Sequence, residues 1–388
     1  MGKTLVVKLG KRRISIVDDS CLKQDCRYFL HDRPCKFHKK EGVLCHSCPY
    51  FEKIGRRVAV IKLDALGDVL RTMAILPPLR NEYPDSSIVW ITRENAIPLF
   101  ENVEFVDEVL DYGDPFTTHL LQTASFDLVI NPDTSRAAML MASLCKAKEK
   151  VGFFLGNSGQ IISSNHKAHE WFLMGINDNI KKRNTRTYQQ IILDMLELNE
   201  SDTYIPLNLS KKDKEDGEAF CKEKTLDRRG PIIGLNTGAG RRWQNKIWPI
   251  AHYEELIERL LRRKVQVLLL GGIDEKLKID ILKKKFGDKV VSGGCDNSLR
   301  KFLSVLDICN VVVSSDTMAA HAALALGKKL VVFFGPTSIN EFEVYGRGIK
   351  LSANIDCLAC YRSTCDRKPN CMDLLKPEIV EDAILQLL

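Results

Sequence analysis

The amino-acid sequence predicts an α/β fold in which two doubly wound parallel-sheet domains follow a Cys-rich N-terminal extension. The chain has 388 residues, enough for two to three domains of roughly 100–200 residues each. From Arg57 onward, apolar segments of strand length alternate with amphipathic helical segments, the pattern of a parallel sheet. The alternation is interrupted by a polar stretch at 211–229 and then restarts. We therefore expect two Rossmann-like domains, at 56–210 and 229–388, behind an extension at 1–55.

The extension and the first domain provide the first set of expected elements. In the extension, a strand pair at Thr4–Leu9 and Arg13–Val17 precedes a segment rich in Cys, His and Lys. Short β-branched and aliphatic runs predict the strands of the first domain, namely Val58–Leu63, Ile88–Ile91, Val106–Leu110 and Leu128–Ile130. Helical spacing of apolar residues predicts Val69–Arg80, interrupted by Pro77 and Pro78, and Arg136–Ala147.

The polar stretch at 211–229 is expected to be a helix that leads into a linker. The second domain then repeats the alternation. Its expected strands are Ile232–Asn236, Val265–Leu270, Val290–Val291, Val311–Ser314 and Leu330–Phe334. Its expected helices are Ile250–Arg263, Glu275–Phe286, Leu299–Val305 and Met318–Leu326.

The composition is that of a globular protein with a sizeable core, since 45% of the residues are hydrophobic and 28% are charged. No apolar run approaches the roughly 20 residues that cross a bilayer, and the N-terminus lacks a secretory apolar region. We therefore expect a cytoplasmic location. The net charge of +7 fits either a solvated basic surface or attraction to an anionic substrate or membrane surface. No signature of nucleic-acid binding accompanies it, so no nucleic-acid partner is expected.

The first motif runs from Ile61 to Leu70 and contains Gly67 followed by Asp68. A strand ends here, a glycine permits a tight turn, and an acidic residue begins a helix. Asp68 is either only a helix cap or a general base at the rim of a cleft. No Gly-x-Gly-x-x-Gly is present, so the usual dinucleotide fingerprint is missing.

The second motif runs from Gly234 to Gly240 and is followed by Lys246-Ile247-Trp248-Pro249. A strand that enters a glycine-rich loop brings backbone N–H groups close to a phosphate, and the lysine adds positive charge. No Gly-Lys-Ser/Thr follows, so the motif does not favour ATP or GTP hydrolysis. A plain turn is the alternative interpretation.

The third motif joins Val312–His321 to Leu330–Thr337. A strand, an Asp-Thr pair and a helix of small residues again present a helix N-terminus, whose partial positive charge suits a diphosphate. Asp316 alone would read as a helix cap. His321 lies one turn into the helix, where packing beside the site is favoured over catalysis.

Taken in order, the three motifs resemble glycosyltransferase family 9, the heptosyltransferases, over residues 58–337. The resemblance implies the GT-B architecture and an inverting, metal-independent transfer of a heptose or related sugar from an ADP-sugar to a hydroxyl of a lipopolysaccharide-type acceptor. Asp68 matches the catalytic base of the family, Lys246 the lysine that holds the donor phosphates, and Asp316 with Thr317 the donor-binding turn. The residues assigned to the donor are Thr237, Gly238, Gly240, Lys246, Asp316, Thr317, Met318 and His321.

One position departs from the family pattern. The family commonly has glycine directly after Asp-Thr, where this chain has Met318. ADP-heptose itself is therefore a weaker expectation than the transferase class. The chain contains no Asp-x-Asp, so no metal-clamped donor and no catalytic cofactor are expected.

The acceptor is not identified by any motif. Arg136 and Arg186 lie in loops of the first domain and are candidates for acceptor phosphates or carboxylates, because arginine binds such groups with two parallel hydrogen bonds. Each is equally a candidate for a surface salt bridge. A glycolipid acceptor implies peripheral association with the inner face of the membrane.

Thirteen cysteines are unusual for a cytoplasmic chain, and nine of them fall in two clusters. The N-terminal cluster, with His31, His38 and His46 interleaved, is Cys21, Cys26, Cys35, Cys45 and Cys48. The C-terminal cluster is Cys357, Cys360, Cys365 and Cys371. Structural zinc or iron, or an Fe–S cluster, and metal-free thiol loops are the two interpretations. Cys145, Cys221, Cys295 and Cys309 lie on apolar patterns and are expected in the core.

Two other functions remain open from the sequence. A sugar-nucleotide 2-epimerase would keep the fold but needs further acidic and histidine groups that the sequence does not identify. A metal-binding or redox-sensing protein on a degenerate transferase scaffold would explain the cysteines. The presence of Asp68, Lys246 and Asp316 in one chain counts against it.

Overall fold

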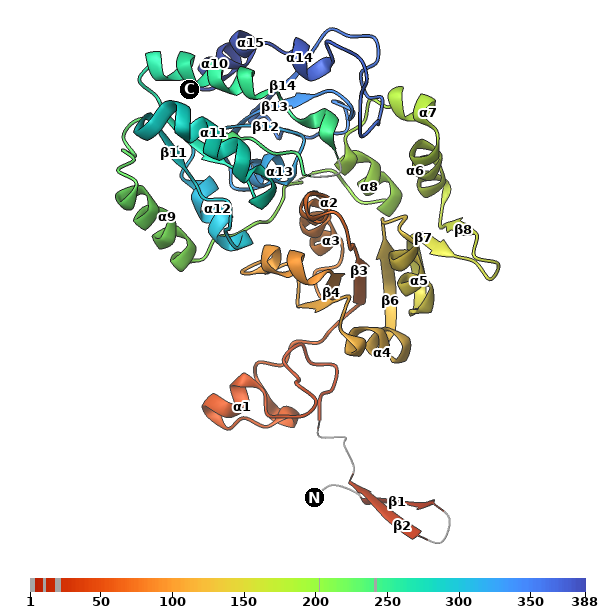
Figure 1. Ribbon diagram of the computed structural model, residues 1–388. Coiled ribbons are helices and arrows are strands. Elements are labelled where there is room, and N and C mark those ends of the chain that lie inside the picture. Colours follow the sequence, from red (N-terminus) through yellow and green to blue (C-terminus); the bar gives the residue numbers. More distant parts are fainter. Residues whose placement is uncertain (1–3, 10–11, 18–21, 202, 241–242) are drawn as a thin grey trace.

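The computed structural model describes residues 4–9, 12–17, 22–201, 203–240 and 243–388. Two lobes, each built on a six-stranded sheet, sit above a small N-terminal extension (Figure 1). This is the architecture predicted from the alternation of strands and helices.

The sheet of the first lobe has the strand order β5-β4-β3-β6-β7-β8. Its strands are β3 (Arg57–Ile61), β4 (Ser87–Thr92), β5 (Glu108–Asp111), β6 (Ser125–Asn131), β7 (Lys146–Leu155) and β8 (Ile161–Ser163). All neighbours are parallel except β8, which runs antiparallel to β7. The chain proceeds outward in opposite directions from β3 and β6, so the topological switch point lies between these two strands.

The helices of the first lobe are α2 (Leu66–Thr72), α3 (Leu76–Glu82), α4 (Pro115–Thr123), α5 (Arg136–Leu144), α6 (His166–Ile176), α7 (Asp178–Lys182) and α8 (Tyr188–Leu196), with 3₁₀ helices η3 (Met73–Ile75) and η4 (Glu94–Phe100). Of these, α4, α6, α7 and α8 were not predicted from the sequence pattern. The expected helix Val69–Arg80 is interrupted by η3 and not at the two prolines. Pro77 and Pro78 occupy the first turn of α3, where a missing N–H costs no intrahelical bond.

The sheet of the second lobe is parallel throughout, in the order β11-β10-β9-β12-β13-β14. Its strands are β9 (Ile232–Asn236), β10 (Gln266–Leu270), β11 (Val290–Ser292), β12 (Val311–Ser315), β13 (Lys329–Phe334) and β14 (Gly348–Ser352). Its helices are α9 (Lys211–Glu223), α10 (Ile250–Arg262), α11 (Lys276–Phe286), α12 (Leu299–Asp307), α13 (Met318–Ala325), α14 (Cys371–Leu374) and α15 (Pro377–Leu387), with 3₁₀ helices η5 (Gln244–Lys246), η6 (Ile273–Glu275) and η7 (Gly287–Lys289). Here the switch point lies between β9 and β12.

Both sheets are covered on both faces, which explains why their strands read as continuous apolar runs. In β3, Val58 and Val60 pack with α2, α3 and α8, while Ala59 and Ile61 pack with α4 and α5. In β9, Ile233 and Leu235 pack with α10, α11 and α15. The opposite face of that sheet joins the same apolar cluster as α2 of the first lobe.

The two lobes meet where α2 packs against α13. A Cβ atom added to Gly67 would lie 3.3 Å from both the Cα and the backbone N of Met318. Glycine at this position therefore permits the close approach of the two helices. The N-termini of α2 and α13 consequently lie side by side between the two sheets.

The extension begins with the expected antiparallel strand pair, β1 (Thr4–Leu9) and β2 (Arg12–Val17). A short helix, α1 (Lys36–Glu41), and a 3₁₀ turn, η2 (Cys45–Ser47), follow. None of the helices in the described part of the chain is long and apolar enough to cross a membrane.

Candidate functional site

A cavity of about 940 Å³ lies between the lobes, at the carboxyl ends of the parallel strands. Ligands of doubly wound sheets bind at this edge, next to the topological switch point. Side chains from both lobes line the cavity, among them Asp68 and Arg71 from α2 and Lys246, Asp316 and His321 from the second lobe. The three sequence motifs, which are far apart in the chain, therefore meet in one site.

Asp68 lies in the first turn of α2, directly after β3. One carboxylate oxygen is 2.8 Å from Nη2 of Arg71, and the other accepts a hydrogen bond of 3.2 Å from the backbone N–H of Ala65. Burial raises the pKa of Asp68, but the positive charges of Arg71 and Lys62 outweigh burial and bring the pKa below its ordinary value. The side chain keeps 39% of its surface exposed at the cavity. Asp68 is thus an ionised carboxylate that can accept a proton from a bound molecule.

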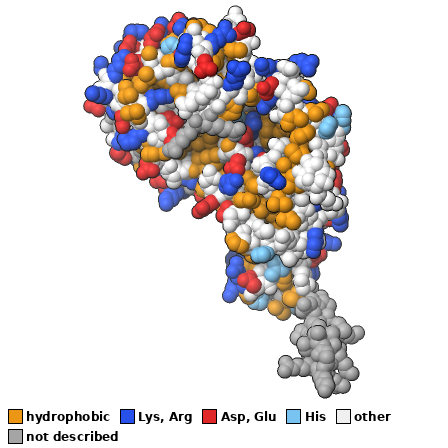
Figure 2. Space-filling model, turned by 45° about the vertical axis from the view of Figure 1, so that its right-hand side comes forward, with side chains coloured by type: hydrophobic (Ala, Val, Ile, Leu, Met, Phe, Trp, Pro, Cys, Tyr) orange, Lys and Arg blue, Asp and Glu red, His pale blue; other side chains and the backbone are white. Residues whose placement is uncertain are grey.

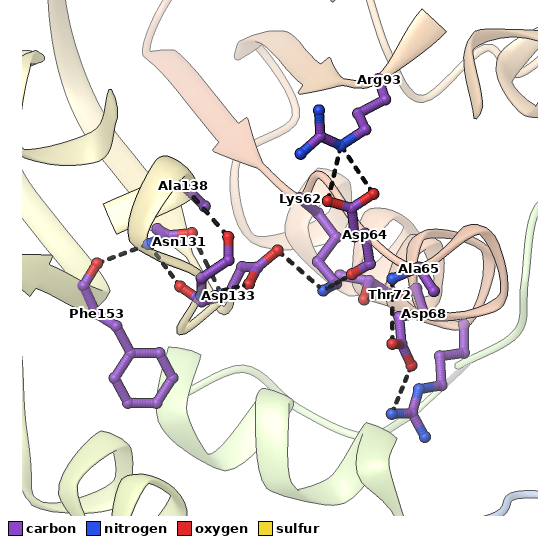
Figure 3. Close-up of polar contacts among 12 residues, drawn as sticks. Lys62, Asp64, Ala65, Asp68, Thr72, Arg93, Asn131, Asp133, Ala138 and Phe153 are labelled. Atoms are coloured by element: carbon purple, nitrogen blue, oxygen red, sulfur yellow. Dashed lines mark hydrogen bonds and ion pairs between the residues drawn. The ribbon is translucent and has the colours of Figure 1, made fainter. Parts of the chain in front are cut away.

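A buried ion pair lies beside the turn that carries Asp68 (Figure 3). Nζ of Lys62, at the end of β3, lies 3.2 Å from the carboxylate of Asp133, and both side chains are less than 10% exposed. Lys62 also donates to the carbonyl oxygen of Asp64. Nε of Arg93 donates to both carboxylate oxygens of Asp64, at 2.7 and 2.8 Å. These contacts fix the loop between β3 and α2, and with it the position of Asp68.

The glycine-rich turn after β9 is tied to the end of β12. Nδ2 of Asn236 donates to the carbonyl oxygen of Gly238 at 3.2 Å and to Oγ of Ser314 at 3.0 Å. Gly238 faces Glu275, since a Cβ atom at this glycine would lie 2.4 Å from the Glu275 carboxylate carbon. Gly240 has a φ of +69°, a backbone conformation that favours glycine. Gly238 and Gly240 line the cavity, whereas Thr237 is buried beneath the turn.

Lys246 and Asp316 form a buried pair on the second lobe. Nζ of Lys246 donates to the carboxylate of Asp316 at 2.8 Å and to its carbonyl oxygen at 2.9 Å. Oγ1 of Thr337 donates to the same carboxylate at 2.8 Å. Burial raises the pKa of Asp316, but Lys246 and then His321 hold it well below its ordinary range. The pair therefore places one cation and one anion at the wall of the cavity.

The N-terminus of α13 completes this wall. Thr317 is its N-cap residue, and Met318 begins the helix and lines the cavity. Free N–H groups at a helix N-terminus favour a phosphate. His321 is 5% exposed and stacks on Phe342 with ring centroids 4.5 Å apart. This agrees with the expectation that His321 packs beside the site.

Burial lowers the pKa of His321 to about 4, although the carboxylate of Asp316 opposes the shift. In the unfolded chain the ordinary pKa is 6.5. Between these values the unfolded chain binds a proton that the folded chain does not, so folding is weakened as the pH falls from 6.5 toward 4. We expect His321 to account for a loss of about 2 kcal/mol between pH 7.5 and pH 5.

Urea unfolding at both pH values measures this loss. His321→Gln should lose less stability on acidification than the parent chain. His166, whose side chain is 81% exposed, provides the control variant His166→Gln, which should behave as the parent. His252 also has a pKa lowered by burial, so some pH dependence remains in every variant. An unchanged slope in His321→Gln would contradict the expectation.

Several residues of the cavity were not identified from the sequence. Arg71 lies one turn after Asp68, and this i,i+3 spacing is a signal that could have found it. Lys181 of α7 lines the cavity with its Nζ 3.7 Å from the ring centre of Tyr361. The hydroxyl of Tyr361 donates to Glu341 at 2.9 Å. No local pattern marks Glu341 or Tyr361, and Lys181 stands in a basic run, Lys181-Lys182-Arg183, that local sequence alone does not assign to the cavity.

The two arginines proposed for the acceptor do not line the cavity. Arg186 pairs with Asp194 of α8 at 2.5 Å, which supports the salt-bridge interpretation. Arg136 is exposed at the start of α5, outside the set of residues that line the cavity. Positive charge on the first-lobe side of the cavity comes from Arg71 and Lys181 instead.

The cysteine clusters have no ready-made metal geometry. Among the described residues, no group of three or more His, Cys, Asp or Glu side chains is arranged to hold a metal ion, so the predicted sites are not confirmed. Burial, and next the neighbouring Cys360, raise the pKa of Cys371 to about 11. Cys21 lies outside the described residues.

The four cysteines expected in the core fall into two groups. Cys145, Cys221 and Cys309 are buried as expected. Cys295 is half-buried and lines the main cavity. It lies in the loop between β11 and α12 and packs against the apolar cluster of the second lobe, so it is only partly within the core.

Comparison with known proteins finds one matching family model and a set of similar sequences. The model of glycosyltransferase family 9 (heptosyltransferase) matches residues 117–371. Lipopolysaccharide heptosyltransferase 2 of Salmonella typhimurium is 30% identical over 125 residues, which are 31% of this chain and 35% of that protein. The aligned region thus spans about a third of the length of that relative.

Solved structures extend the likeness to both lobes. A glycosyl transferase family 9 protein from Veillonella parvula has a TM-score of 0.71 at 17% identity, covering 86% of this chain and 97% of its own. The E. coli ADP-heptose LPS heptosyltransferase II has a TM-score of 0.64 at 17% identity, covering 85% of this chain and 98% of its own. At this identity the likeness shows the fold, and it confirms the expected GT-B architecture.

Proposed function

This chain belongs to glycosyltransferase family 9, and we propose that it transfers a heptose, or a related sugar, from an ADP-sugar to a hydroxyl of a lipopolysaccharide-type acceptor. The observation that carries the proposal is the meeting of Asp68 from one lobe with Lys246, Asp316 and the N-terminus of α13 from the other. A proton acceptor and a phosphate-binding wall thus face one cavity.

The proposed reaction is a single displacement with inversion. The acceptor oxygen forms a bond to the anomeric carbon as the bond from that carbon to the diphosphate oxygen breaks. Asp68 takes the hydroxyl proton, and the leaving ADP keeps the electron pair of the broken bond. Lys246 and the N–H groups at the start of α13 stabilise the charge that develops on the diphosphate.

Metal independence is supported by the charges that the chain itself supplies. Lys246 and the N-terminus of α13 lie on the donor side, and Arg71 and Lys181 lie across the cavity. The sequence also lacks the Asp-x-Asp that would clamp a divalent ion on the donor. We propose that no cofactor takes part in catalysis.

Arg71 and Lys181 are the better candidates for contacts to an anionic acceptor, in place of Arg136 and Arg186. The acceptor is proposed to be a glycolipid, reached by a cytoplasmic protein that associates peripherally with the inner face of the membrane. Figure 2 shows hydrophobic side chains gathered on the face of the first lobe. Large apolar side chains exposed on α4, α5 and β8 support this association: Phe116, Leu140, Leu144, Ile161 and Ile162.

The two alternatives from the sequence are not favoured. A degenerate transferase scaffold would not need to keep a proton acceptor and a phosphate-binding wall facing one cavity, as this chain does. A 2-epimerase needs further acidic and histidine groups at the reacting carbon, whereas His321 is stacked on Phe342. The C-terminal cysteines, which are free and half-buried, remain a proposed structural zinc or iron site.

The test is donor binding followed by turnover. Calorimetry with ADP, UDP and GDP is expected to show selective binding of ADP. Incubation with ADP-heptose and a deacylated lipopolysaccharide acceptor is expected to release ADP only when both are present. Equal binding of all three nucleotides, or ADP release that does not depend on the acceptor, would contradict the proposal.

A further inference from the structure

Residues 22–55 of the extension form a defined structure without a hydrophobic core. None of the side chains in this segment is buried, and Leu30 and Leu44 are 43% and 53% exposed. The backbone is nevertheless ordered into α1, η2 and a β-bridge between Cys26 and Lys53. Segments shorter than about 40 residues rarely fold without a disulfide, a metal ion or a partner chain. Something other than apolar burial must therefore hold this segment together.

Four cysteine side chains of this segment converge on a single small cavity. Cys26, Cys35, Cys45 and Cys48 line a cavity of about 20 Å³. That volume accommodates about one atom or one water molecule, so neither a nucleotide nor a sugar fits. The cysteines are free thiols, so no disulfide closes the segment. The N-terminal cluster predicted from sequence spacing is thus gathered around one point in space.

The four thiols come from three separate parts of the segment. Cys26 is in the β-bridge, and Cys35 is the N-cap residue of α1. Cys45 and Cys48 flank one tight turn, in which the backbone N–H of Cys48 donates to the carbonyl oxygen of Cys45 at 3.4 Å. A Cys-x2-Cys turn joined to two distant cysteines is the arrangement of ligands in many structural zinc sites.

Aromatic rings make up most of the remaining wall. Phe37 stacks on Tyr50 with ring centroids 4.1 Å apart, and Tyr28 meets Phe37 edge to face at 4.9 Å. No histidine is among the residues that line the cavity, and Nδ1 of His38 is hydrogen-bonded to the carbonyl oxygen of Val43 at 3.0 Å. The ligands available at the cavity are therefore four sulfur atoms. A tetrahedral set of four thiolates selects zinc or iron.

We propose that Cys26, Cys35, Cys45 and Cys48 bind one structural metal ion, zinc or iron, that holds the extension in its fold. In the described residues the thiols are not yet arranged as a formed metal site, so binding draws them inward. The four thiols release four protons as they become thiolate ligands, and no oxidant or reductant is needed. The free energy of metal binding then takes the place of the missing core.

The position of the extension argues for a structural role and against a catalytic one. Arg27 pairs with Asp107 and donates to the carbonyl oxygen of Ser86 at 2.9 Å, while the backbone N–H of Gly55 donates to the carbonyl oxygen of Asp85 at 2.9 Å. These partners lie at the amino ends of β4 and β5. The catalytic cavity lies at the carboxyl ends of the strands, so the proposed metal sits at the opposite edge of the sheet (Figure 1).

Elemental analysis of the full-length chain, purified without chelators, tests the proposal. The double variant Cys45→Ser/Cys48→Ser should lose about one equivalent of zinc or iron per chain relative to the parent. Cys145→Ser, which changes a buried thiol outside both clusters, should lose none. Cys357→Ser/Cys360→Ser separates this site from the C-terminal cluster, because its loss should add to the first.

A conservative variant guards against simple unfolding of the extension. Cys35→His keeps a metal ligand, so it should keep the equivalent while changing the visible spectrum of the cobalt-substituted protein from that of four sulfur ligands to that of three sulfurs and one nitrogen. The proposal is overturned if the parent chain carries no metal, or if Cys45→Ser/Cys48→Ser keeps all of it. ADP release by the Cys45→Ser/Cys48→Ser variant should stay within about two-fold of the parent, so failure of this proposal and failure of the proposed function are separate results.

Discussion

Asp68→Asn is expected to lower the rate of sugar transfer by about 10²–10⁴-fold, while ADP binds as before. The amide keeps the size of the carboxylate but cannot accept the proton of the acceptor hydroxyl. ADP contacts are proposed for the opposite wall, around Lys246 and α13, so calorimetry with ADP should show little change. Turnover of ADP-heptose, measured as ADP released, gives the rate.

Asp64→Asn is the matched control. Asp64 lies in the same loop and pairs with Arg93, but it does not line the cavity. The amide oxygen of asparagine can still accept a hydrogen bond from Arg93, so the loop is kept and the substitution should cost no more than a few-fold in rate. If Asp68→Asn retained more than half of the parent activity, the assignment of the base would fail.

The pH dependence of the same reaction gives a second check. Arg71 and Lys62 keep the pKa of Asp68 below its ordinary value of 3.8. A carboxylate with a lowered folded pKa is ionised throughout the neutral range and loses both its stabilising pair and its activity only below that value. The activity of the parent should therefore show no loss from Asp68 between pH 8 and pH 5. A loss centred near neutral pH would identify a different base.

The strands that lie buried between two layers of helices could be predicted from the sequence. β3, β9 and β12 read as apolar runs because helices cover both of their faces. β7 was not predicted because its first five residues, Lys146 to Lys150, include four charged side chains. The short strand β8 pairs only with the end of β7, at Phe153–Leu155, so the first part of β7 lies at the edge of the sheet and these side chains remain in water. The local pattern therefore failed to predict β7, because the exposure of its side chains is set by the tertiary fold.

The residues of the site likewise divide into those with a local sequence signal and those without one. Asp68, Lys246 and Asp316 each lie in a motif that begins with a strand, so local sequence indicated them as candidates. Lys181 and Tyr361 stand 180 positions apart and meet at 3.7 Å only because the lobes pack together. Their pairing depends on long-range packing that no local spacing encodes.

Lys246→Met is expected to weaken ADP binding by about 10–100-fold and to lower the free energy of unfolding by about 3 kcal/mol. The two effects have different causes. An ammonium carries three N–H groups, so Lys246 can serve Asp316 and a phosphate oxygen at once. The loss of stability arises because Asp316, whose side chain is 18% exposed, keeps its negative charge without its cation.

The double variant Lys246→Met/Asp316→Asn separates the two causes. Removing both charges should recover most of the lost stability, because replacing a buried pair costs less than breaking it. It should not recover ADP binding, since the ammonium group of Lys246 that is proposed to meet the diphosphate is still missing. Urea unfolding at pH 7.5 and calorimetry with ADP on the parent, the single variant and the double variant provide the comparison. Recovery of both stability and ADP affinity would show that Lys246 is only a structural partner of Asp316. The N-terminus of α13 would then be the remaining phosphate-binding group proposed for this wall of the cavity.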